Sequence, residues 1–229
     1  MLSARRATCQ APRENCPDPV DTRRVVLWRH GQTMWNAERR YQGQTDIPLD
    51  ETGLAQAQRA ARQLAALGPH VIVSSDLTRA AETAQALAEL TGIPVRYDRR
   101  LRERSGGVWE GLTNDEIREG YPVEWARWDP PGGEDDGELA KRMAAAVTDA
   151  VGLLPDGGTL VVASHGSAIR AGLGRLLDLA EGRWRMLGPV QNCSWSVIAQ
   201  APEGWDYTGW RLVEHNAGTL PLPVLSDDR

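Results

Sequence analysis

Three short apolar runs in this chain end in polar residues and lead into helical patterns, and this arrangement constrains the fold more than any other feature. Residues 25–28 lead into Arg-His-Gly at 29–31, residues 71–73 into Ser-Ser-Asp, and residues 159–163 into Ser-His-Gly at 164–166. Short apolar runs bounded by such residues are typical of buried strands. Strands that alternate with helices form a parallel sheet. The sequence therefore predicts an α/β fold, a three-layer α/β/α sandwich around a mostly parallel central sheet.

Later segments complete this prediction. Residues 194–199 and 207–214 are expected to form an antiparallel pair, which gives the sheet an antiparallel edge strand. Asp50 or Thr52 is expected to cap the helix before the second strand, and the polar residues 74–76 the helix after it. Short polar side chains at these positions accept hydrogen bonds from the free N–H groups of a helix start.

The chain is expected to form one domain between two terminal extensions. We predict a disordered leader at residues 1–23, a folded domain at residues 24–217 and a C-terminal tail at residues 218–229. The leader contains no apolar segment of the kind found in secretory signals. An odd number of cysteines without such a signal fits a reducing compartment, so we expect a cytoplasmic protein.

Charge and hydropathy exclude two classes of partner. The net charge of the 229-residue chain is −5, and no basic stripe of the kind that binds nucleic acid stands out. No apolar run approaches the length needed to span a bilayer, so we expect no membrane partner. An anion site in this acidic protein has to be a local concentration of positive charge.

The predicted strand ends supply such a concentration on one side of the sheet. Arg29 and His30 follow the first strand, Arg79 lies in the first turn of the helix after the second, and His165 with Gly166 follows the third. Ligands of open α/β sheets bind beyond the carboxyl ends of the strands. Positive charge at a helix start opposes the helix dipole, which makes sense for Arg79 if an anion binds there. These groups predict a pocket for a dianion such as phosphate.

Alternatives stay open at three points in this region. Two histidines suit a metal ion, but zinc sites need at least three ligands and neighbouring arginines repel a cation, so we expect no metal. Glu103, between two arginines and before a glycine-containing loop, is either a proton donor or a salt-bridged surface carboxylate. Trp125 and Trp128, in the least regular part of the chain, either form a lid over the pocket or staple a local core.

A series of short motifs follows in a fixed order through residues 24–166. They are Arg29-His30-Gly31-Gln32-Thr33, Asn36, Gln42-Gly43, the run from Ser74 to Ala80, Leu101-Arg102-Glu103, the run from Gly107 to Gly111, Gly132-Gly133-Glu134 and Ser164-His165-Gly166. In identity, order and spacing these motifs resemble the histidine phosphatase superfamily, in its phosphoglycerate mutase-like branch. The tight spacing makes the signal specific.

The resemblance implies a phosphomonoester hydrolase that needs no metal or other cofactor. His30 is expected to attack phosphorus and form a phosphohistidine, with its other ring nitrogen held by a backbone carbonyl. Arg29, Arg79 and His165 stabilise the equatorial oxygens, and Glu103 protonates the leaving alcohol and then activates water. The substrate-binding residues that it implies are Asn36, Gln42, Gly43, Gly166 and Leu212.

The expected substrate is a small phosphorylated metabolite of the sugar phosphate or phosphoglycerate type. A cofactor-dependent phosphoglycerate mutase is one alternative, although similar mutases carry a longer insertion and extra basic residues where residues 112–137 are short and acidic. A non-catalytic phosphate-binding regulatory module is another, but it would not need the intact His30, Glu103 and His165.

The C-terminal half of the chain indicates which subfamily the chain resembles and whether it forms a dimer. It resembles the actinobacterial glucosyl-3-phosphoglycerate phosphatases in Asn192-Cys193-Ser194-Trp195, in Trp210-Arg211-Leu212 and in residues 215–218. The physiological substrate stays open at this point. Because the antiparallel pair can leave an exposed edge that a partner covers, and members of the family are often dimers, we expect a homodimer.

Overall fold

The computed structural model describes residues 22–201 and 209–218. Most of the expected leader and tail lies outside these residues. The sheet has six strands in the order β3-β2-β4-β1-β5-β6. The strands are β1 (Arg24–Arg29), β2 (Val71–Ser74), β3 (Val95–Tyr97), β4 (Thr159–Ser164), β5 (Trp195–Gln200) and β6 (Trp210–Ala217).

The strand directions confirm the mostly parallel sheet. β1, β2, β3 and β4 run parallel, β5 is antiparallel to β1, and β6 is antiparallel to β5. Arg29 pairs with Ser164, and Ser74 pairs with Ala163. The carboxyl ends of the three central strands therefore lie level, which brings the residues that follow them to one edge of the sheet.

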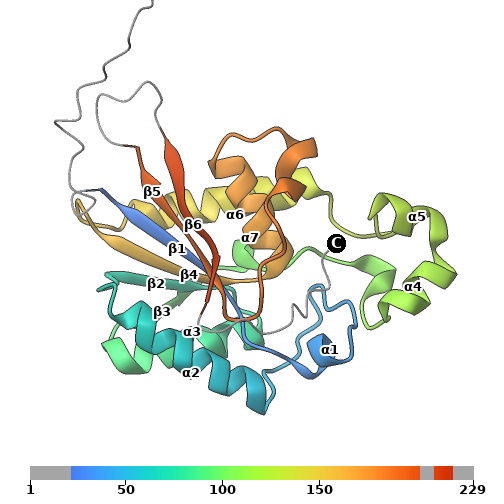
Figure 1. Ribbon diagram of the computed structural model, residues 1–229, viewed down its shortest axis with the longest axis horizontal. Helices are drawn as coiled ribbons and strands as arrows, with labels where there is room; N and C mark the ends of the chain where they lie inside the picture. The colour runs from blue at the N-terminus through green and yellow to red at the C-terminus, as the bar shows by residue number, and fades with distance from the viewer. Residues whose placement is uncertain (1–21, 202–208, 219–229) are drawn as a thin grey trace, which may run out of the picture.

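Helices cover both faces of the sheet, as Figure 1 shows. The helices α2 (Glu51–Ala65) and α3 (Thr78–Thr91) lie on one face, and α6 (Asp136–Val151) and α7 (Gly166–Leu176) lie on the other. The remaining elements are α1 (Met34–Ala37), α4 (Asn114–Gly120), α5 (Pro122–Arg127) and the 3-10 helices η1 (Arg99–Leu101), η2 (Gly107–Trp109) and η3 (Glu181–Met186).

Alternating side chains of the central strand divide the core into two halves. Val25 and Leu27 of β1 belong to the cluster formed with α6 and α7, whereas Val26 and Trp28 belong to the cluster formed with α2 and α3. Successive side chains of a strand point to opposite faces, so a strand buried on both faces reads as a continuous apolar run. This accounts for the apolar runs in the sequence.

A small lobe beside the carboxyl ends of the strands carries its own aromatic core. It contains α4 and α5 (Figure 1), and its rings belong to Tyr41, Trp109, Trp125 and Trp128. The ring centres of Trp109 and Trp128 are 5.4 Å apart, and those of Trp125 and Trp128 are 5.0 Å apart. This packing supports a local core for Trp125 and Trp128 and not a lid over the pocket.

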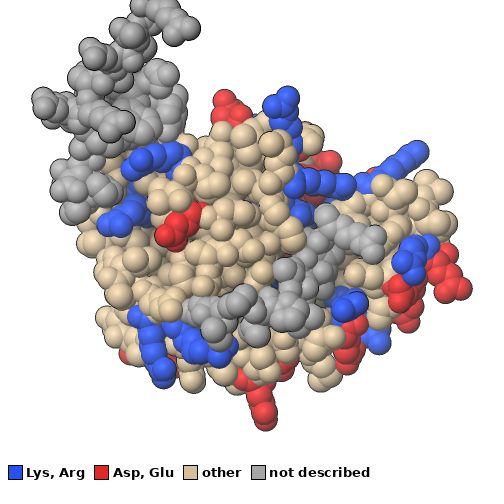
Figure 2. Space-filling view, in the orientation of Figure 1, with Lys and Arg blue, Asp and Glu red and all other residues tan. Residues whose placement is uncertain are grey.

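Surface charge and helix length add two observations. The face shown in Figure 2 carries Lys and Arg side chains interspersed with Asp and Glu, and it has a broad uncharged area between them. None of the helices in the described part of the chain is long and apolar enough to cross a membrane.

Helix capping was predicted correctly for one helix and wrongly for another. Asp50 caps α2, and its carboxylate accepts from the Gly53 N–H at 2.8 Å. The predicted caps at residues 74–76 do not cap α3, which starts after Leu77 without a side-chain cap of its own. Instead Asp46, distant in sequence, accepts from the Thr78 N–H at 2.7 Å and from its hydroxyl at 2.8 Å. A tertiary contact thus replaces the local cap.

Replacement of Asp46 by alanine is expected to lower the free energy of unfolding by about 1 kcal/mol, the usual effect of losing a helix cap. The change also frees the loop that precedes α2 from the start of α3. Urea titration of the variant against the wild type measures the difference. Asp115→Ala is the matched control because this carboxylate, 85% exposed, pairs only with Arg118 among the contacts shown, and exposed ion pairs contribute little. An equal loss in both variants would contradict the prediction.

Candidate active site

His30 lies immediately beyond the end of β1 and is buried. Its Nδ1 is 2.7 Å from the carbonyl oxygen of Gly31. A carbonyl only accepts, so this contact places the ring proton on Nδ1 and leaves the lone pair on Nε2. The backbone contact thus selects the tautomer in which Nε2 can act as a nucleophile.

His165 lies next to His30 and is held by neighbours on both sides of its ring. It occupies the N-cap position of α7, and the two ring centres are 5.2 Å apart. Arg79 Nε donates to its Nδ1 at 3.2 Å, so its proton is on Nε2, which lies 2.9 Å from the hydroxyl of Ser75. The Nε2–H group therefore donates to Ser75 in this structure.

Both histidines are held in the neutral form. Burial lowers the pKa of His30 well below its ordinary value, and the nearby charges of Arg79 and Arg29 lower it further. Burial also lowers the pKa of His165 well below its ordinary value, with further contributions from Arg79, His30, Arg29 and Arg142. Protonation of either ring would add positive charge to a buried site that already holds two arginines. A neutral His30 keeps its nucleophilic lone pair.

These lowered pKa values predict a loss of stability in mild acid. The unfolded chain binds protons at its histidines near pH 6.5 while the folded protein does not, so the stability contributed is present above the unfolded pKa and lost as the pH falls below it. We expect each histidine to reduce the free energy of unfolding by roughly 1.4 kcal/mol between about pH 7.5 and about pH 5.5. Urea titrations of the wild type and His165→Gln at both pH values measure this, and an equal drop in both proteins would contradict it.

Two buried arginines bracket the histidines. Arg79, in the first turn of α3, donates to the carbonyl oxygens of Thr45 at 2.9 Å and Gly43 at 2.7 Å as well as to His165. Arg29 donates through NH1 to the carbonyl oxygen of Val190 at 2.6 Å. Among the described residues, Arg29 Nε is buried without a hydrogen-bond partner. An unpaired buried donor is costly, and an anion in the site would satisfy it.

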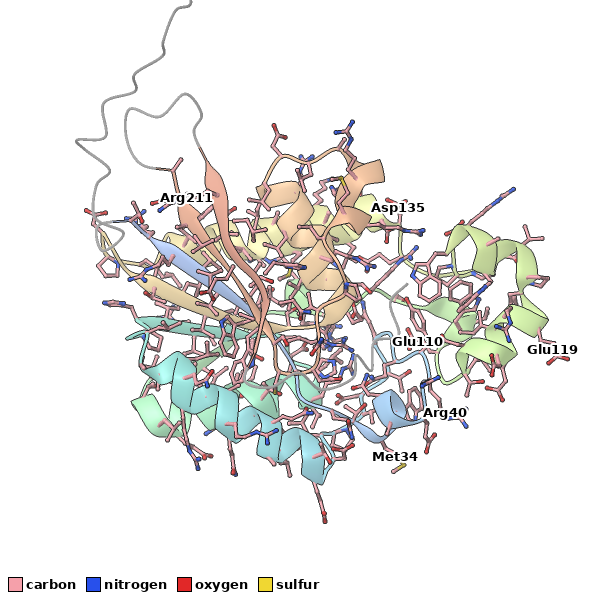
Figure 3. The ribbon with its side chains drawn as sticks, viewed as in Figure 1. Met34, Arg40, Glu110, Glu119, Asp135 and Arg211 are labelled. Atoms are coloured by element: carbon pink, nitrogen blue, oxygen red, sulfur yellow. The ribbon has the colours of Figure 1, made fainter. Side chains whose placement is uncertain are left out.

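The loop that carries the Gly43 and Thr45 carbonyls is fixed by Glu110. Figure 3 shows Glu110 between α1 and the lobe of α4 and α5. Its carboxylate accepts from the N–H groups of Gln44 at 3.1 Å and Thr45 at 3.0 Å and from the Thr45 hydroxyl at 2.6 Å. Gly43 has a φ of +52°, and a Cβ there would collide with the Glu110 carboxylate. Glu110 therefore orients Arg79 through this loop.

Glu103 lies at the start of α7, opposite the histidines. Its carboxylate accepts from the N–H groups of Ser167 at 3.1 Å, Ala168 at 3.0 Å and Arg104 at 2.8 Å. Helix N-termini favour negative charge through their free N–H groups and the helix dipole. These contacts are made to backbone N–H groups, so they do not support the alternative of a carboxylate that is salt-bridged at the surface.

A small cavity joins these groups. Its volume is about 20 Å³, and its lining consists of Arg29, His30, Tyr41, Gln42, Gly43, Arg79, Glu103 and Ser167. This space is about that of one or two water molecules. A phosphoryl group that reacts here would carry its leaving group outside the cavity.

The structure brings most of the expected site residues together, but not all. Gly166 follows His165 at the start of α7, next to the cavity. Asn36 is buried behind the cavity, where its side-chain oxygen accepts from the Thr33 N–H at 3.1 Å and from Asn192 at 3.2 Å. It does not line the cavity, so the direct phosphate contact expected of it stays a prediction.

Leu212 is not brought to the cavity. It pairs with Ile198, which pairs with Val25, four residues before Arg29 along β1. Four residues of a strand span about 13 Å. Figure 3 shows its neighbour Arg211 on the sheet far from Glu110. The structure thus places Leu212 toward the opposite end of the sheet, and its expected substrate contact stays a prediction.

The structure adds residues to which no role in the site was assigned from the sequence. Tyr41 and Ser167 line the cavity, and Ser75 holds His165. Ser75 directly follows β2, and Ser167 lies in the first turn of α7 shortly after β4, so the same signal that indicated His30 could have indicated them. Arg142 contacts the Glu103 loop from the middle of α6, and no local pattern marks it. Within the described part of the chain, no group of three or more His, Cys, Asp or Glu side chains could hold a metal ion.

Comparison with known proteins agrees with this geometry. The model of the histidine phosphatase superfamily (branch 1) matches residues 25–213. A glucosyl-3-phosphoglycerate phosphatase of Mycobacterium tuberculosis is 41% identical over 212 residues, which cover 85% of this chain and 95% of the relative. A probable phosphoglycerate mutase of Yersinia pestis is 37% identical over 219 residues, 89% of this chain and 97% of the relative.

A solved structure agrees with these sequence matches. The structure of mycobacterial glucosyl-3-phosphoglycerate phosphatase complexed with VO3 superimposes with a TM-score of 0.80 at 40% identity, covering 86% of this chain and all of the other. The chain therefore belongs to the histidine phosphatase superfamily, as an enzyme that hydrolyses phosphoric monoesters. The family and enzyme class predicted from the sequence motifs are confirmed.

Proposed function

We propose that this enzyme releases phosphate from a small phosphorylated sugar or glycerate compound, without a metal ion, through a phosphohistidine on His30. Glucosyl-3-phosphoglycerate is the first candidate substrate. The observation that carries the proposal is the state of His30, whose Nδ1 is bound to the Gly31 carbonyl at 2.7 Å while the ring lines the cavity. This leaves Nε2 as an uncharged nucleophile in a site suited to a dianion.

The other groups at the cavity supply what phosphoryl transfer requires. Arg29 and Arg79 offer positive charge and N–H donors for the equatorial oxygens, the largest contribution in reactions of this type. The neutral His165 would add its Nε2–H group, which donates to Ser75 in this structure. Glu103 donates a proton to the leaving oxygen and, in the second step, accepts one from the water that attacks the phosphohistidine. These protein cations supply positive charge at the site, which supports a reaction without a metal.

The substrate class rests on the relatives. The phosphatase of Mycobacterium tuberculosis that is 41% identical acts, by its name, on glucosyl-3-phosphoglycerate. The cavity is small and the leaving group would lie outside it, so the cavity lining sets few limits on the leaving group. Asn36, Gln42, Gly43, Gly166 and Leu212 are proposed to bind substrate, with Asn36 acting from behind the cavity.

A phosphoglycerate mutase is the second candidate because a 37% identical relative carries that name. A mutase and a phosphatase both phosphorylate the first histidine and differ in what accepts the phosphoryl group. The acidic residues Glu134, Asp135 and Asp136 disfavour retention of a bisphosphate near the lobe. A non-catalytic phosphate-binding module is a third candidate, which has no use for the fixed carboxylate of Glu103.

One panel of assays separates these functions. Phosphate release is measured from glucosyl-3-phosphoglycerate, 3-phosphoglycerate, sugar phosphates and p-nitrophenyl phosphate, in the presence of EDTA. Base-quenched samples are tested for an acid-labile, base-stable phosphoenzyme. Release that resists EDTA and proceeds through this species is expected. Loss of activity with EDTA would overturn metal independence, interconversion of phosphoglycerates that depends on bisphosphoglycerate would indicate a mutase, and phosphate binding without turnover would indicate a binding module.

We further propose that the enzyme is a cytoplasmic homodimer whose folded domain spans residues 24–217. β6 is the last strand on its side of the described sheet, and an edge strand offers N–H and C=O groups to a partner. Light scattering coupled to size-exclusion chromatography measures the assembly. A mass of one chain at micromolar concentration would contradict the dimer.

A further inference from the structure

All five N–H donors of one side chain, Arg142, are used: three at the segment that carries Glu103 and two at the carboxylate of Glu134. Arg142 lies in α6, which begins beside Asp135 (Figure 3). Its Nε and NH2 donate to the two carboxylate oxygens of Glu134 at 2.6 and 2.7 Å. Its NH1 donates to the carbonyl oxygens of Arg100 and Arg102, both at 2.7 Å, and its NH2 also donates to that of Glu103 at 2.8 Å. A guanidinium offers five N–H groups in a rigid fork.

These contacts fix the backbone of the residue proposed as the general acid. The Glu103 carbonyl faces α6, where it accepts from Arg142, and it also accepts from Gln44 Nε2 at 3.1 Å. Its carboxylate points to the other side, to the N–H groups at the start of α7. Glu103 is therefore held at both ends, between α6 and α7. A change at Arg142 removes one of the two hydrogen bonds to the Glu103 carbonyl and leaves the weaker contact with Gln44 and the carboxylate contacts.

Glu134 keeps Arg142 in this position. The side chains of the pair are 19% and 18% exposed, so solvent screens their interaction only in part. Glu134 is also tied to the same segment through its backbone, since its N–H donates to the Ser105 carbonyl at 3.0 Å and its carbonyl accepts from Arg104 Nε at 2.7 Å. Arg142 thus contacts one carboxylate and three backbone carbonyls. These contacts link α6 to residues 100–103, which an ion pair at the surface would not do.

We propose that Arg142, held by Glu134, is a positioning residue that sets the place of the Glu103 carboxyl group relative to the leaving oxygen. The inference rests on the proposed function of Glu103. Neither Arg142 nor Glu134 lines the cavity, so neither contacts the phosphoryl group, and their effect on Glu103 passes through the backbone of residues 100–103. Geometry errors of about 1 Å caused away from the reacting atoms can reduce a rate by about 10²-fold.

The experiment compares two substrates that differ in their need for a proton. An alkyl phosphate has a leaving group that must be protonated, whereas p-nitrophenol leaves readily as its anion. The value of kcat/KM covers the steps up to leaving-group departure and so excludes the later hydrolysis of the phosphohistidine, in which Glu103 acts as a base. For Arg142→Met, kcat/KM for the alkyl phosphate is expected to fall about 10²-fold, while that for p-nitrophenyl phosphate and the inhibition constant of inorganic phosphate change less than about threefold.

Three further variants make the test specific. Arg142→Lys keeps the charge but cannot supply the fork, so we expect only a partial recovery of alkyl phosphate hydrolysis. Glu134→Gln is expected to shift the substrate ratio in the same direction, and the double variant Arg142→Met/Glu134→Gln to be little worse than Arg142→Met. Lys141→Met is the control on the same helix, because this ammonium is 73% exposed and lies 3.7 Å from Glu138; it is expected to keep the wild-type ratio.

The outcomes are distinguishable. A wild type that releases no phosphate, or keeps its activity in His30→Ala, overturns the proposed function itself. An active wild type whose Arg142 variants lose both substrates equally, or lose neither, overturns the positioning role alone. If Arg142→Met does not fold, Arg142→Lys and Glu134→Gln decide the question by the same substrate ratio.

Discussion

Replacement of His30 by alanine is expected to lower kcat for phosphate release by roughly 10⁵-fold, the scale seen when an enzyme loses its nucleophile. No other described side chain at the cavity offers an uncharged nitrogen in the same position, because the lone pair of His165 on Nδ1 accepts a hydrogen bond from Arg79. The buried arginines remain, so the variant should still bind inorganic phosphate. Stopped assays with excess enzyme measure the residual rate.

His30→Gln and His70→Ala complete this test. Glutamine retains much of the volume of His30, so a variant that folds but releases no phosphate separates chemistry from packing. His70 is an exposed histidine whose Nδ1 accepts from the Thr159 N–H at 3.2 Å, at the opposite end of the sheet. His70→Ala is expected to keep wild-type activity. An active His30→Gln, or a phosphoenzyme formed without His30, would assign the nucleophile to another residue.

The central part of the fold was predictable because its signals are local. Strands buried on both faces have to be apolar throughout, so β1, β2 and β4 stand out in the sequence. Asp50 was predictable as a cap because its partner, Gly53, is three residues away. The start of α3 was not predictable in this way, because its cap is Asp46 in a distant loop. Nearby residues that look like better caps have other partners: Ser75 binds His165 and Asp76 pairs with Arg102.

The same distinction separates the predicted and the missed parts of the site. Strand register brings Arg29, His30 and His165 together and places the start of α3, with Arg79, beside them, since parallel strands end at the same edge of the sheet. Glu103 reaches them from a loop; its neighbours left two roles open, and the resemblance to a family motif indicated the proton donor. Arg142 has no such signal, because three backbone carbonyls and a carboxylate define its role and none of these is visible in a local pattern.

Replacement of Glu103 by glutamine is expected to separate the two steps of the reaction. An amide cannot protonate the leaving oxygen, so kcat/KM for an alkyl phosphate should fall by about 10²–10⁴-fold, the usual contribution of a general acid. The corresponding value for p-nitrophenyl phosphate should fall less than about tenfold, because its leaving group departs without a proton. Phosphorylation of His30 then remains fast with this substrate, while its hydrolysis, which needs Glu103 as a base, becomes slow.

Slow hydrolysis has a direct signature. In Glu103→Gln, p-nitrophenol should appear in a rapid burst of about one molecule per active site, followed by a slow steady rate, and base-quenched samples should contain the phosphohistidine. Glu138→Gln is the matched control, since this carboxylate is 70% exposed and lies 3.7 Å from Lys141; it should show neither the burst nor the substrate dependence. Equal losses for both substrates without a burst would mean that Glu103 supports the site structurally and that the proton comes from elsewhere. A burst with a preserved kcat/KM for the alkyl phosphate would mean that Glu103 acts only in the step in which water attacks the phosphohistidine. The full expected pattern arises only if one carboxyl group serves as acid in the first step and as base in the second, which is what its place at the start of α7, across the cavity from His30, allows.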